Sequence, residues 1–478
     1  MPRGDSLRIV IGGAGEVGRG VAKALRSEGR DVVLIDPDPT AIKEAQALDV
    51  MIVQGDINRR KDLKEAEVHK AEVFIAATDR DEKNLIACAL ARDINEHEGN
   101  GVKLMTIARV HGAELVHAEK PEAFKRWSGV DHAVCSDLLV IGDLKAGLKA
   151  SSMHEVLSLG NDAWVAVVQV EPSADQMVHK TLEEAENEID GLPRIFGMKR
   201  QKERSKIPGW QESITSGDLL AFATIGQHSF RRILQAAGHT PPKYPEKPRV
   251  LIFGATRLGR QIAASYLKDG SRVTVISQSL EGANELAGSK IGEDTNLDVM
   301  HGDAMDADLL TEIDIDNHDI SIAVLSDDHT NMAVSMQAAE MGVERTGLVL
   351  DDSRMATVAR RIGQSFAVSR RRVAINNILR QVHSKVEGNY HLLSSVPEIV
   401  GMSATIGPGH KMLDKEVSVL EREGALCRVA FILRPVRGGK ESMLRASGDQ
   451  VFKEGDRLML FARVEDIGKV EERLLTGS

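Results

Sequence analysis

The sequence of 478 residues is poor in aromatic side chains, which make up only 3% of it, so its cores must be mostly aliphatic. Its three cysteines, Cys88, Cys135 and Cys427, are odd in number and far apart. They fit neither a disulfide framework nor a CxxC zinc site, and they favour a reducing cytoplasm. No apolar run reaches the roughly 18 residues that span a bilayer, and the N-terminus has no long apolar segment of the signal-peptide type.

An excess of basic charge is also missing. The chain has 61 Lys and Arg against 71 Asp and Glu, a formal net charge of −10. That balance argues against a general nucleic-acid binder, which usually has a basic surface, but it does not exclude a nucleotide held by backbone amides. With 42% hydrophobic and 28% charged residues, the composition is that of a globular protein, and the length predicts about two to four domains.

What the sequence does contain is a glycine loop directly after a short apolar run. The segment RIVIGGAGEVG extends from Arg8 to Gly18 and is followed by the helix-like VAKALRSEG. Its glycines have GxGxxG spacing, which suits a tight turn, close approach of a pyrophosphate and close packing of the helix on the strand. The predicted loop residues are Gly13, Ala14, Gly15, Glu16, Val17 and Gly18.

The context of this loop strengthens the prediction of a nucleotide site. A second apolar segment, DVVLID, ends at Asp36, close to the spacing of about 20 residues at which such folds place an acid on the ribose hydroxyls. A carboxylate there would also repel a 2′-phosphate. The alternative is a sheet that keeps a glycine turn without any ligand.

Alternating strand-like and helix-like segments continue after Asp36, which predicts a doubly wound parallel sheet. Ligands of such sheets bind at the carboxyl ends of the strands, which makes candidates of Asp56, Thr78, Asp79 and Arg109. Each has an alternative role. Asp56 could be a plain turn residue, Thr78 or Asp79 could cap the following helix, and Arg109 could form a surface ion pair instead of binding phosphate.

The second half of the chain repeats this pattern. RVLIFGATRLG, from Arg249 to Gly259, corresponds to the first glycine loop, and FIAATDRDEKN corresponds to SIAVLSDDHTN, so that Asn331 matches Asn84. The segment ITSGDLLAF near residue 218 also resembles VFKEGDRLMLF near residue 456. So many matches in one order indicate a tandem duplication of a unit of roughly 240 residues.

The second copy departs from the first at positions that matter for a nucleotide. Thr256 replaces Gly15, and Ser277 replaces Asp36. The corresponding site residues are Gly254, Ala255, Thr256, Arg257, Leu258 and Ser277. This site could bind a different nucleotide, bind weakly or be structural, and we favour weak or absent binding because the loop glycine allows close backbone approach.

The predicted fold is α/β, with two tandem Rossmann-like doubly wound parallel sheets, each followed by a small α+β domain. Within the first small domain the Gly- and Pro-punctuated, basic segment from Asp190 to Trp210 is predicted to be a mobile loop. A Pro-rich segment is predicted to link the two halves. The expected divisions are residues 1–150, 151–236, 237–248 (the linker), 249–386 and 387–478.

The motifs GAGEVG, VVLID, AATDRDEKNLIACALA, TIARV and GVDHAVCSDLL, taken in order and doubled, resemble the TrkA family of RCK or KTN domain proteins. The resemblance covers essentially the whole chain. It implies a cytoplasmic regulatory subunit of the Trk potassium-uptake system, peripheral at the inner face of the membrane. It also implies binding of NAD(H) and of ADP or ATP, assembly into a homo-oligomeric ring and an integral-membrane channel partner. The basic insertion around residues 191–210 is longer than is usual in that family.

Two other functions stay open at this level. An NAD-dependent oxidoreductase would need a His, Lys or Tyr set against the nicotinamide, but the 15 histidines are scattered without a catalytic or metal-binding context. We therefore expect no enzyme and no metal site. An RCK-type regulator of another transporter cannot be separated from a Trk subunit, because the partner's surface is not in the sequence.

Overall fold

The computed structural model describes residues 8–476 apart from 100, 102, 113–127, 161, 241–242, 362–365, 386–388, 391–392, 394, 422–425 and 437–439. The chain forms two compact units that do not follow the two halves of the sequence. The first contains residues 1–139 and 370–390, and the second contains residues 140–369 and 391–478. Each half therefore gives its last Rossmann helix, wholly or in large part, to the unit that contains the other half's sheet.

The first unit contains a six-stranded parallel sheet in the order β3-β2-β1-β4-β5-β6, the order of a dinucleotide-binding fold. Buried runs such as Ile9-Val10-Ile11 form its strands because both faces are covered by helices. Its elements are β1 (Arg8–Gly12), α1 (Glu16–Ser27), β2 (Asp31–Asp36), α2 (Pro39–Ala45), β3 (Met51–Gln54), α3 (Arg60–Glu65), β4 (Val73–Ala76), α4 (Asp81–Glu98), β5 (Met105–Val110) and β6 (His132–Cys135).

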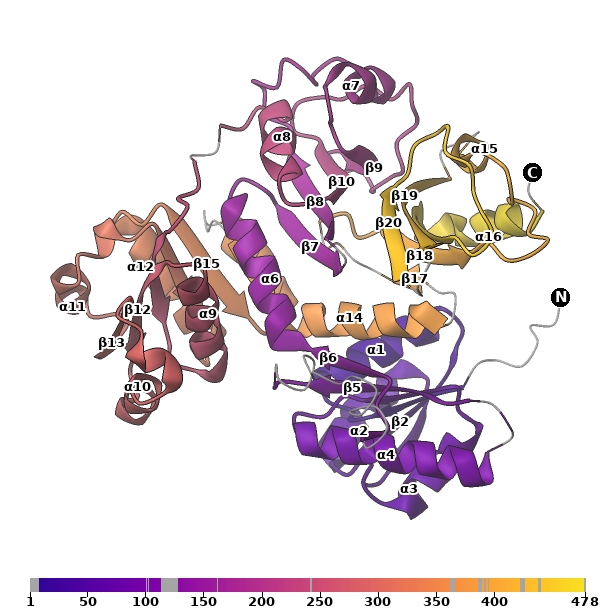
Figure 1. Cartoon of the computed structure of the whole chain (residues 1–478), viewed down its shortest axis with the longest axis horizontal. Coiled ribbons are helices and arrows are strands. Elements are labelled where there is room, and N and C mark those ends of the chain that lie inside the picture. The colour runs from indigo at the N-terminus through magenta and orange to yellow at the C-terminus, as the bar shows by residue number, and fades with distance from the viewer. Residues whose placement is uncertain are drawn as a thin grey trace. The chain divides into compact units, whose positions relative to one another are not determined.

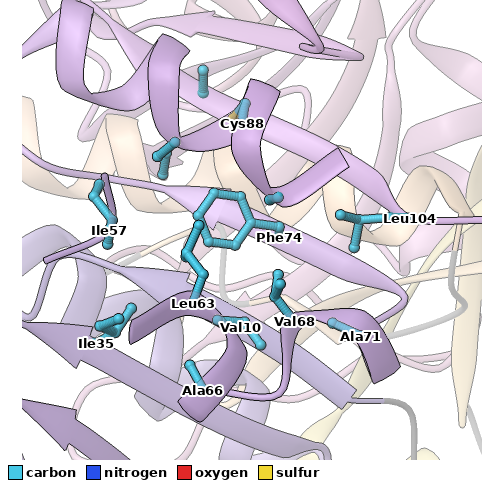
Figure 2. Packing of buried hydrophobic residues seen from close by; sticks show 14 of the residues in the cluster. Val10, Ile35, Ile57, Leu63, Ala66, Val68, Ala71, Phe74, Cys88 and Leu104 are labelled. Carbon is cyan, nitrogen blue, oxygen red and sulfur yellow. The ribbon is translucent and has the colours of Figure 1, made fainter. Parts of the chain in front are cut away.

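One face of this sheet packs on an aliphatic core in which Phe74 is the one aromatic residue among those that the structure describes. Phe74 of β4 is fully buried, and Val10, Ile35 and Leu63 surround it (Figure 2). Cys88 of α4 is buried in the same cluster. The core is therefore built as the low aromatic content predicts, mainly from branched aliphatic side chains.

The other face carries α1, and α14 (Arg370–Lys385) lies along it (Figure 1). The two helices approach closely at Gly20, where an added Cβ would lie 2.3 Å from Cδ1 of Ile375. Near their C-terminal ends, Nε2 of His383 lies 3.3 Å from Oε1 of Glu28, and both side chains are buried. The first sheet is thus covered by a helix that comes from the second half of the sequence.

The second unit contains the second six-stranded parallel sheet, in the corresponding order β13-β12-β11-β14-β15-β16. The expected α/β class and the two parallel sheets are confirmed. The elements are β11 (Arg249–Phe253), α9 (Arg257–Lys268), β12 (Arg272–Ser277), α10 (Leu280–Ala287), β13 (Leu297–His301), α11 (Ala307–Glu312), β14 (Ile320–Ala323), α12 (Asp328–Glu340), β15 (Arg345–Leu350), α13 (Ser353–Arg361) and β16 (Phe366–Ser369).

Helix α6 (Ser136–Lys149) comes from the first half and packs against this second sheet from Val140 onward. Its Lys145 ammonium donates to the carboxylate of Asp269, just after α9, at 2.7 Å. An added Cβ at Gly147 would lie 2.2 Å from the ring of Phe366. Helix α14, from the second half, packs on the first sheet. Each sheet is therefore covered by a helix from the other half of the sequence.

The two small domains form sheets in the orders β7-β8-β10-β9 and β17-β18-β21-β19-β20. All of these strands belong to the second unit except β17, which ends the first unit's segment 370–390. Their elements are β7 (Glu155–Gly160), β8 (Ala163–Gln169), α7 (Leu182–Glu188), β9 (Arg194–Lys199), β10 (Leu219–Ile225), α8 (Ser229–Ala236), β17 (Asn389–Tyr390), β18 (Ile399–Thr405), α15 (Val417–Glu421), β19 (Cys427–Val436), β20 (Lys440–Arg445), β21 (Arg457–Arg463) and α16 (Ile467–Thr476).

The two small domains pack on each other through buried side chains. The rings of Phe196 and Phe461 stack with centroids 3.8 Å apart. Nη2 of Arg194 donates to Glu421 at 2.6 Å, and the guanidinium of Arg428 lies 3.5 Å from the centre of the Trp210 ring. A buried ion pair and a cation–π contact therefore join the two halves.

The prediction of a loop from Asp190 to Trp210 is wrong. The segment contains β9, which pairs antiparallel with β10, and Met198 and Lys206 exchange two backbone hydrogen bonds across the turn that follows. Trp210 at its end covers Arg428. The Gly and Pro residues that suggested a loop only bound this hairpin, whose strand RIFGMK is buried at five of its six positions.

Candidate nucleotide site at the first glycine loop

The first glycine loop lies where the strand order of its sheet reverses. β1 pairs with β2 on one side and with β4 on the other, and ligands of such sheets bind at this point. Gly13 follows β1 with φ +103°, a conformation that suits glycine. Its N–H donates to the carbonyl of Ile35, and the N–H of Ala77 donates to the carbonyl of Gly12, at 2.8 and 2.7 Å. The turn is thus fixed to both neighbouring strands.

Gly15 and Gly18 of this loop are glycines for different reasons. An added Cβ at Gly18 would lie 1.8 Å from the carbonyl oxygen of Gly13, so the loop can close on the helix only if residue 18 has no side chain. An added Cβ at Gly15 would meet nothing within 4 Å. Packing within the protein does not require glycine there, whereas a phosphate approaching the backbone would.

The N-terminus of α1 behind Gly15 carries no side-chain cap. Gly15 is the N-cap residue, and no side chain accepts a hydrogen bond there. The first N–H groups of a helix have no partner within the helix, and with the helix dipole they favour an anion. A pyrophosphate therefore fits this loop in shape, donor set and charge.

Asp36 ends β2 beside the loop. One carboxylate oxygen accepts from the N–H of Ala14 at 2.7 Å, and the other accepts from the N–H of Asp38 at 2.8 Å. Each oxygen keeps a further acceptor position. The carboxylate is thus held against the glycine loop with capacity for the hydroxyls of a ribose.

Thr78 lies just after β4, and Arg109 is the last residue but one of β5. One residue that the sequence prediction missed joins them. The amide of the buried Asn84 accepts from the N–H and the hydroxyl of Thr78 at 3.1 and 2.6 Å. Its Nδ2 donates to the carbonyls of Thr78 and Arg109. Asn331 repeats this arrangement in the second half, where it bonds Leu325 and Val349. The match of Asn84 with Asn331 in the repeat was the signal that could have identified it.

Asp81 is a second residue that the prediction missed. Its carboxylate accepts from the N–H groups of His111 and Gly112 at 2.9 Å, and it lies 2.8 Å from Nδ1 of His111. Burial raises the pKa of Asp81, but these hydrogen bonds outweigh burial and hold its pKa below the ordinary value. Asp81 fixes the chain just after β5, close to Arg109.

The remaining predicted residues of the first site either bond within their own turn, are exposed or are buried. The Asp56 carboxylate accepts from the N–H of Asn58 at 3.0 Å, as in the turn-residue alternative. Asp79 is exposed, and α4 begins after Arg80 as N-cap, so neither Thr78 nor Asp79 caps the helix. Glu16 is exposed at the first position of α1, whereas Ala14 and Val17 are buried.

The second glycine loop has the same backbone and a different helix end. Gly254 has φ +114°, and an added Cβ at Gly259 would lie 2.0 Å from the carbonyl of Gly254. Here, however, the hydroxyl of Thr256 accepts from the N–H of Gly259 and donates to the carbonyl of Val324, both at 3.1 Å. The side chain therefore occupies a helix-terminal donor that an anion would otherwise use.

Ser277, at the position of Asp36, is also committed to its own turn. Its hydroxyl donates to the carbonyl of Ser279 at 2.9 Å and accepts from the N–H of the same residue. Of the other loop residues, Ala255 and Leu258 are buried and Arg257 is exposed. The second site thus lacks both the uncapped helix end and the carboxylate of the first.

Two further properties concern metal binding and membranes. Among the residues that the structure describes, no group of three or more His, Cys, Asp or Glu side chains could hold a metal ion. Across the same residues, no helix combines the length and the apolar character needed to cross a membrane.

The fold and the first loop define a protein with tandem Rossmann-type nucleotide-binding folds. The sequence profile of the TrkA-N domain family matches residues 9–136 and 250–370, slightly more than half of the chain. The chain therefore belongs to the TrkA-N domain family, and both parallel sheets lie in the matched segments.

Similar proteins cover the whole chain. The Trk system potassium uptake protein TrkA of Azorhizobium caulinodans is 25% identical over 98% of this chain and 98% of that protein. A TrkA homologue of Methanosarcina mazei is 25% identical over 98% of this chain and 99% of that protein. Among solved structures, the GsuK channel bound to NAD has a TM-score of 0.56 at 19% identity, covering all of this chain and 80% of that chain. The GsuK RCK domain has a TM-score of 0.55 at 19% identity, covering all of this chain and 97% of that chain.

Proposed function

We propose that this protein is a nucleotide-sensing regulatory subunit of a membrane potassium-uptake system, and that it binds NAD(H) and ADP or ATP at its first glycine loop. The observation that carries the proposal is the contrast between the loops. Gly15 leaves the N-terminus of α1 uncapped and open, whereas Thr256 caps the N-terminus of α9. Relatives named as Trk potassium uptake proteins, similar over nearly their whole length, support the physiological setting.

The proposed binding residues have distinct roles. The N–H groups of Glu16, Val17 and Gly18 face the phosphates, and Asp36 accepts from the ribose hydroxyls. Thr78, Asp79 and Arg109 complete the carboxyl edge of the sheet, with Asn84 holding Thr78 and Arg109 in place. Such groups bind and orient a nucleotide. We propose no catalytic residue, and the site acts by binding alone.

Regulation follows from a difference in affinity. A ligand shifts a conformational equilibrium only as far as it prefers one conformation. We propose that ADP, ATP or NAD(H) prefers one arrangement of the protein, in a homo-oligomeric ring at the inner face of the membrane, and that the channel subunit responds to that arrangement. The relatives named as Trk potassium uptake proteins favour a potassium-uptake channel as the partner over another transporter.

The test is a calorimetric titration of the purified protein with ADP, ATP, NAD⁺ and NADH. Asp36→Ala should weaken binding of the nucleotides that the wild type binds by about tenfold, the value of a hydrogen bond to a charged group. Ser277→Ala in the second half is the matched control and should leave every affinity unchanged. Wild-type affinity in Asp36→Ala for all four ligands would reject the assigned site.

The physiological part needs a separate experiment. The protein and its channel subunit, reconstituted in vesicles, should give a potassium flux that depends on the nucleotide added. Flux that is insensitive to all four nucleotides would argue against the regulatory role. Turnover of NADH by the protein alone would point to an oxidoreductase instead.

A further inference from the structure

The strongest unassigned feature near the first loop is an ion pair between segments that are distant in the sequence. Glu16, the first residue of α1, pairs through its carboxylate with the guanidinium of Arg371, the second residue of α14. Both side chains are partly exposed, Arg371 by 38% and Glu16 by 49%. A guanidinium from the second half of the sequence therefore lies at the entrance of the first half's glycine loop.

This position is fixed by the way the two helices pack. Besides Glu16 with Arg371, Gly20 contacts Ile375 and Glu28 contacts His383. The three pairs have the same separation in the sequence, so α1 and α14 run parallel and in register. Their N-termini consequently lie together, and both helix dipoles favour an anion at the same end.

The ion pair between Glu16 and Arg371 lies in a solvent-exposed position. Exposed pairs of this kind contribute little to stability. A phosphate group is a better partner for the guanidinium than a single carboxylate, because it carries more charge and offers two oxygens in the bidentate geometry that Arg prefers.

The corresponding positions at the second loop, one from each half of the sequence, carry the opposite charges. Arg257 stands in the second loop where Glu16 stands in the first. Helix α6 begins after β6 as α14 begins after β16, so Asp137 is the counterpart of Arg371. The helix associated with the first loop thus brings a cation, and its counterpart in the repeat brings an acid.

We propose that Arg371, which comes from the second half of the sequence, is a phosphate-binding residue of the first site. When a nucleotide binds, the guanidinium of Arg371 exchanges the Glu16 carboxylate for a phosphate. This inference rests on the function proposed above. It favours ligands with a terminal phosphate, ADP and ATP, over NAD(H), whose two phosphates are both esterified at their outer ends and carry less charge.

The proposal also explains how binding at one loop could reach the rest of the protein. Arg371 lies two residues after Ser369, which ends β16 in the second sheet. A nucleotide held by the loop and by Arg371 would therefore contact both the first sheet and the start of the segment that leads out of the second.

The test compares ADP and NAD⁺ affinities of wild type, Arg371→Gln and Glu16→Gln by calorimetry, with thermal unfolding as a check on the fold. Arg371→Gln should weaken ADP binding by about tenfold or more and NAD⁺ binding by less, as expected for loss of a charge-assisted hydrogen bond. Glu16→Gln should strengthen ADP binding, because it removes a negative charge from the start of α1. Arg371→Lys should recover only part of the loss.

The matched control is Arg26→Gln, which removes an exposed Arg–Asp pair from the last turn of the same helix α1. It should bind ADP as the wild type does. ADP affinity within twofold of wild type in Arg371→Gln would overturn the role of Arg371 and leave the proposed function intact. A wild type that binds no nucleotide would overturn both.

Discussion

The hydroxyl of Thr256 accepts a hydrogen bond from the backbone N–H of Gly259 at 3.1 Å, at the start of α9. In the first half of the chain, Gly15 stands at the position of Thr256, and no side chain caps the start of α1. The duplicated loops have kept the same turn, yet one helix end is capped from within the protein and the other is open. Thr256 therefore uses a backbone donor for which the first loop offers no side-chain partner.

Removing this cap should cost stability. Thr256→Ala is expected to lower the free energy of unfolding by about 1 kcal/mol, because the N–H of Gly259 loses its partner. Thr256→Ser keeps the hydroxyl and serves as the control. Urea denaturation measures the difference, and equal stability of the Ala and Ser variants would show that the hydrogen bond contributes nothing.

Gly18→Ala and Gly15→Ala should separate folding from binding. An added Cβ at Gly18 meets a backbone carbonyl, so the loop must shift, and overpacking of this kind costs about 1–3 kcal/mol. At Gly15 the added methyl meets open space and should leave the unfolding free energy near wild type while weakening nucleotide binding. Thermal unfolding and calorimetry on both variants check this. An unstable Gly15→Ala would indicate that Gly15 has a structural role.

The buried pair of Arg194 and Glu421 should be important for joining the two small domains. Glu421→Ala leaves Arg194 and the neighbouring Arg428 without their carboxylate, which is expected to cost about 3–5 kcal/mol. Glu465→Ala, at an exposed carboxylate, is the matched control and should change stability by less than about 0.5 kcal/mol. A similar effect of both substitutions on chemical denaturation would contradict the importance of burial here.

Asp81 should make stability depend on pH in the acid range. Because hydrogen bonds lower its pKa in the folded protein, its contribution is complete above the ordinary aspartate pKa of about 3.9. It is lost as the pH falls through the lower folded value. The wild type should therefore exceed Asp81→Asn in stability at pH 7, and the difference should shrink below about pH 4. Denaturation curves at pH 7 and below about pH 4 measure this. A stability difference between wild type and Asp81→Asn that is the same at both pH values would contradict the mechanism.

The cysteines should be unreactive in the folded protein. Burial raises the pKa of Cys427 to about 12 and also raises that of Cys88 and Cys135. Since the thiolate is the reactive form, a thiol reagent at pH 8 should label the native protein slowly and all three positions rapidly in urea. Rapid native labelling of any cysteine would show that its surroundings open readily.

The local elements of the site were predictable because their signals lie within short segments. The apolar run before Gly13, the glycine spacing and the acid that ends DVVLID each reflect one strand or one turn. Asn84 and Asp81 were missed because they bind distant residues: Asn84 bonds Arg109 on the next strand, and Asp81 bonds His111 just after that strand. The strand β9 was missed because its Gly residues and its Pro and basic neighbours outweighed a short buried run, which β10 stabilises by pairing.

By itself, the sequence determined two parallel sheets, two glycine loops and the loss of Gly15 and Asp36 in the second copy, because backbone conformation and strand burial follow from local residue type. The tertiary structure decided which helix covers which sheet. It brought α14 to α1, and so Arg371 to Glu16. That pairing depends on the packing of surfaces distant in the chain, such as Gly20 against Ile375, and no local pattern encodes it.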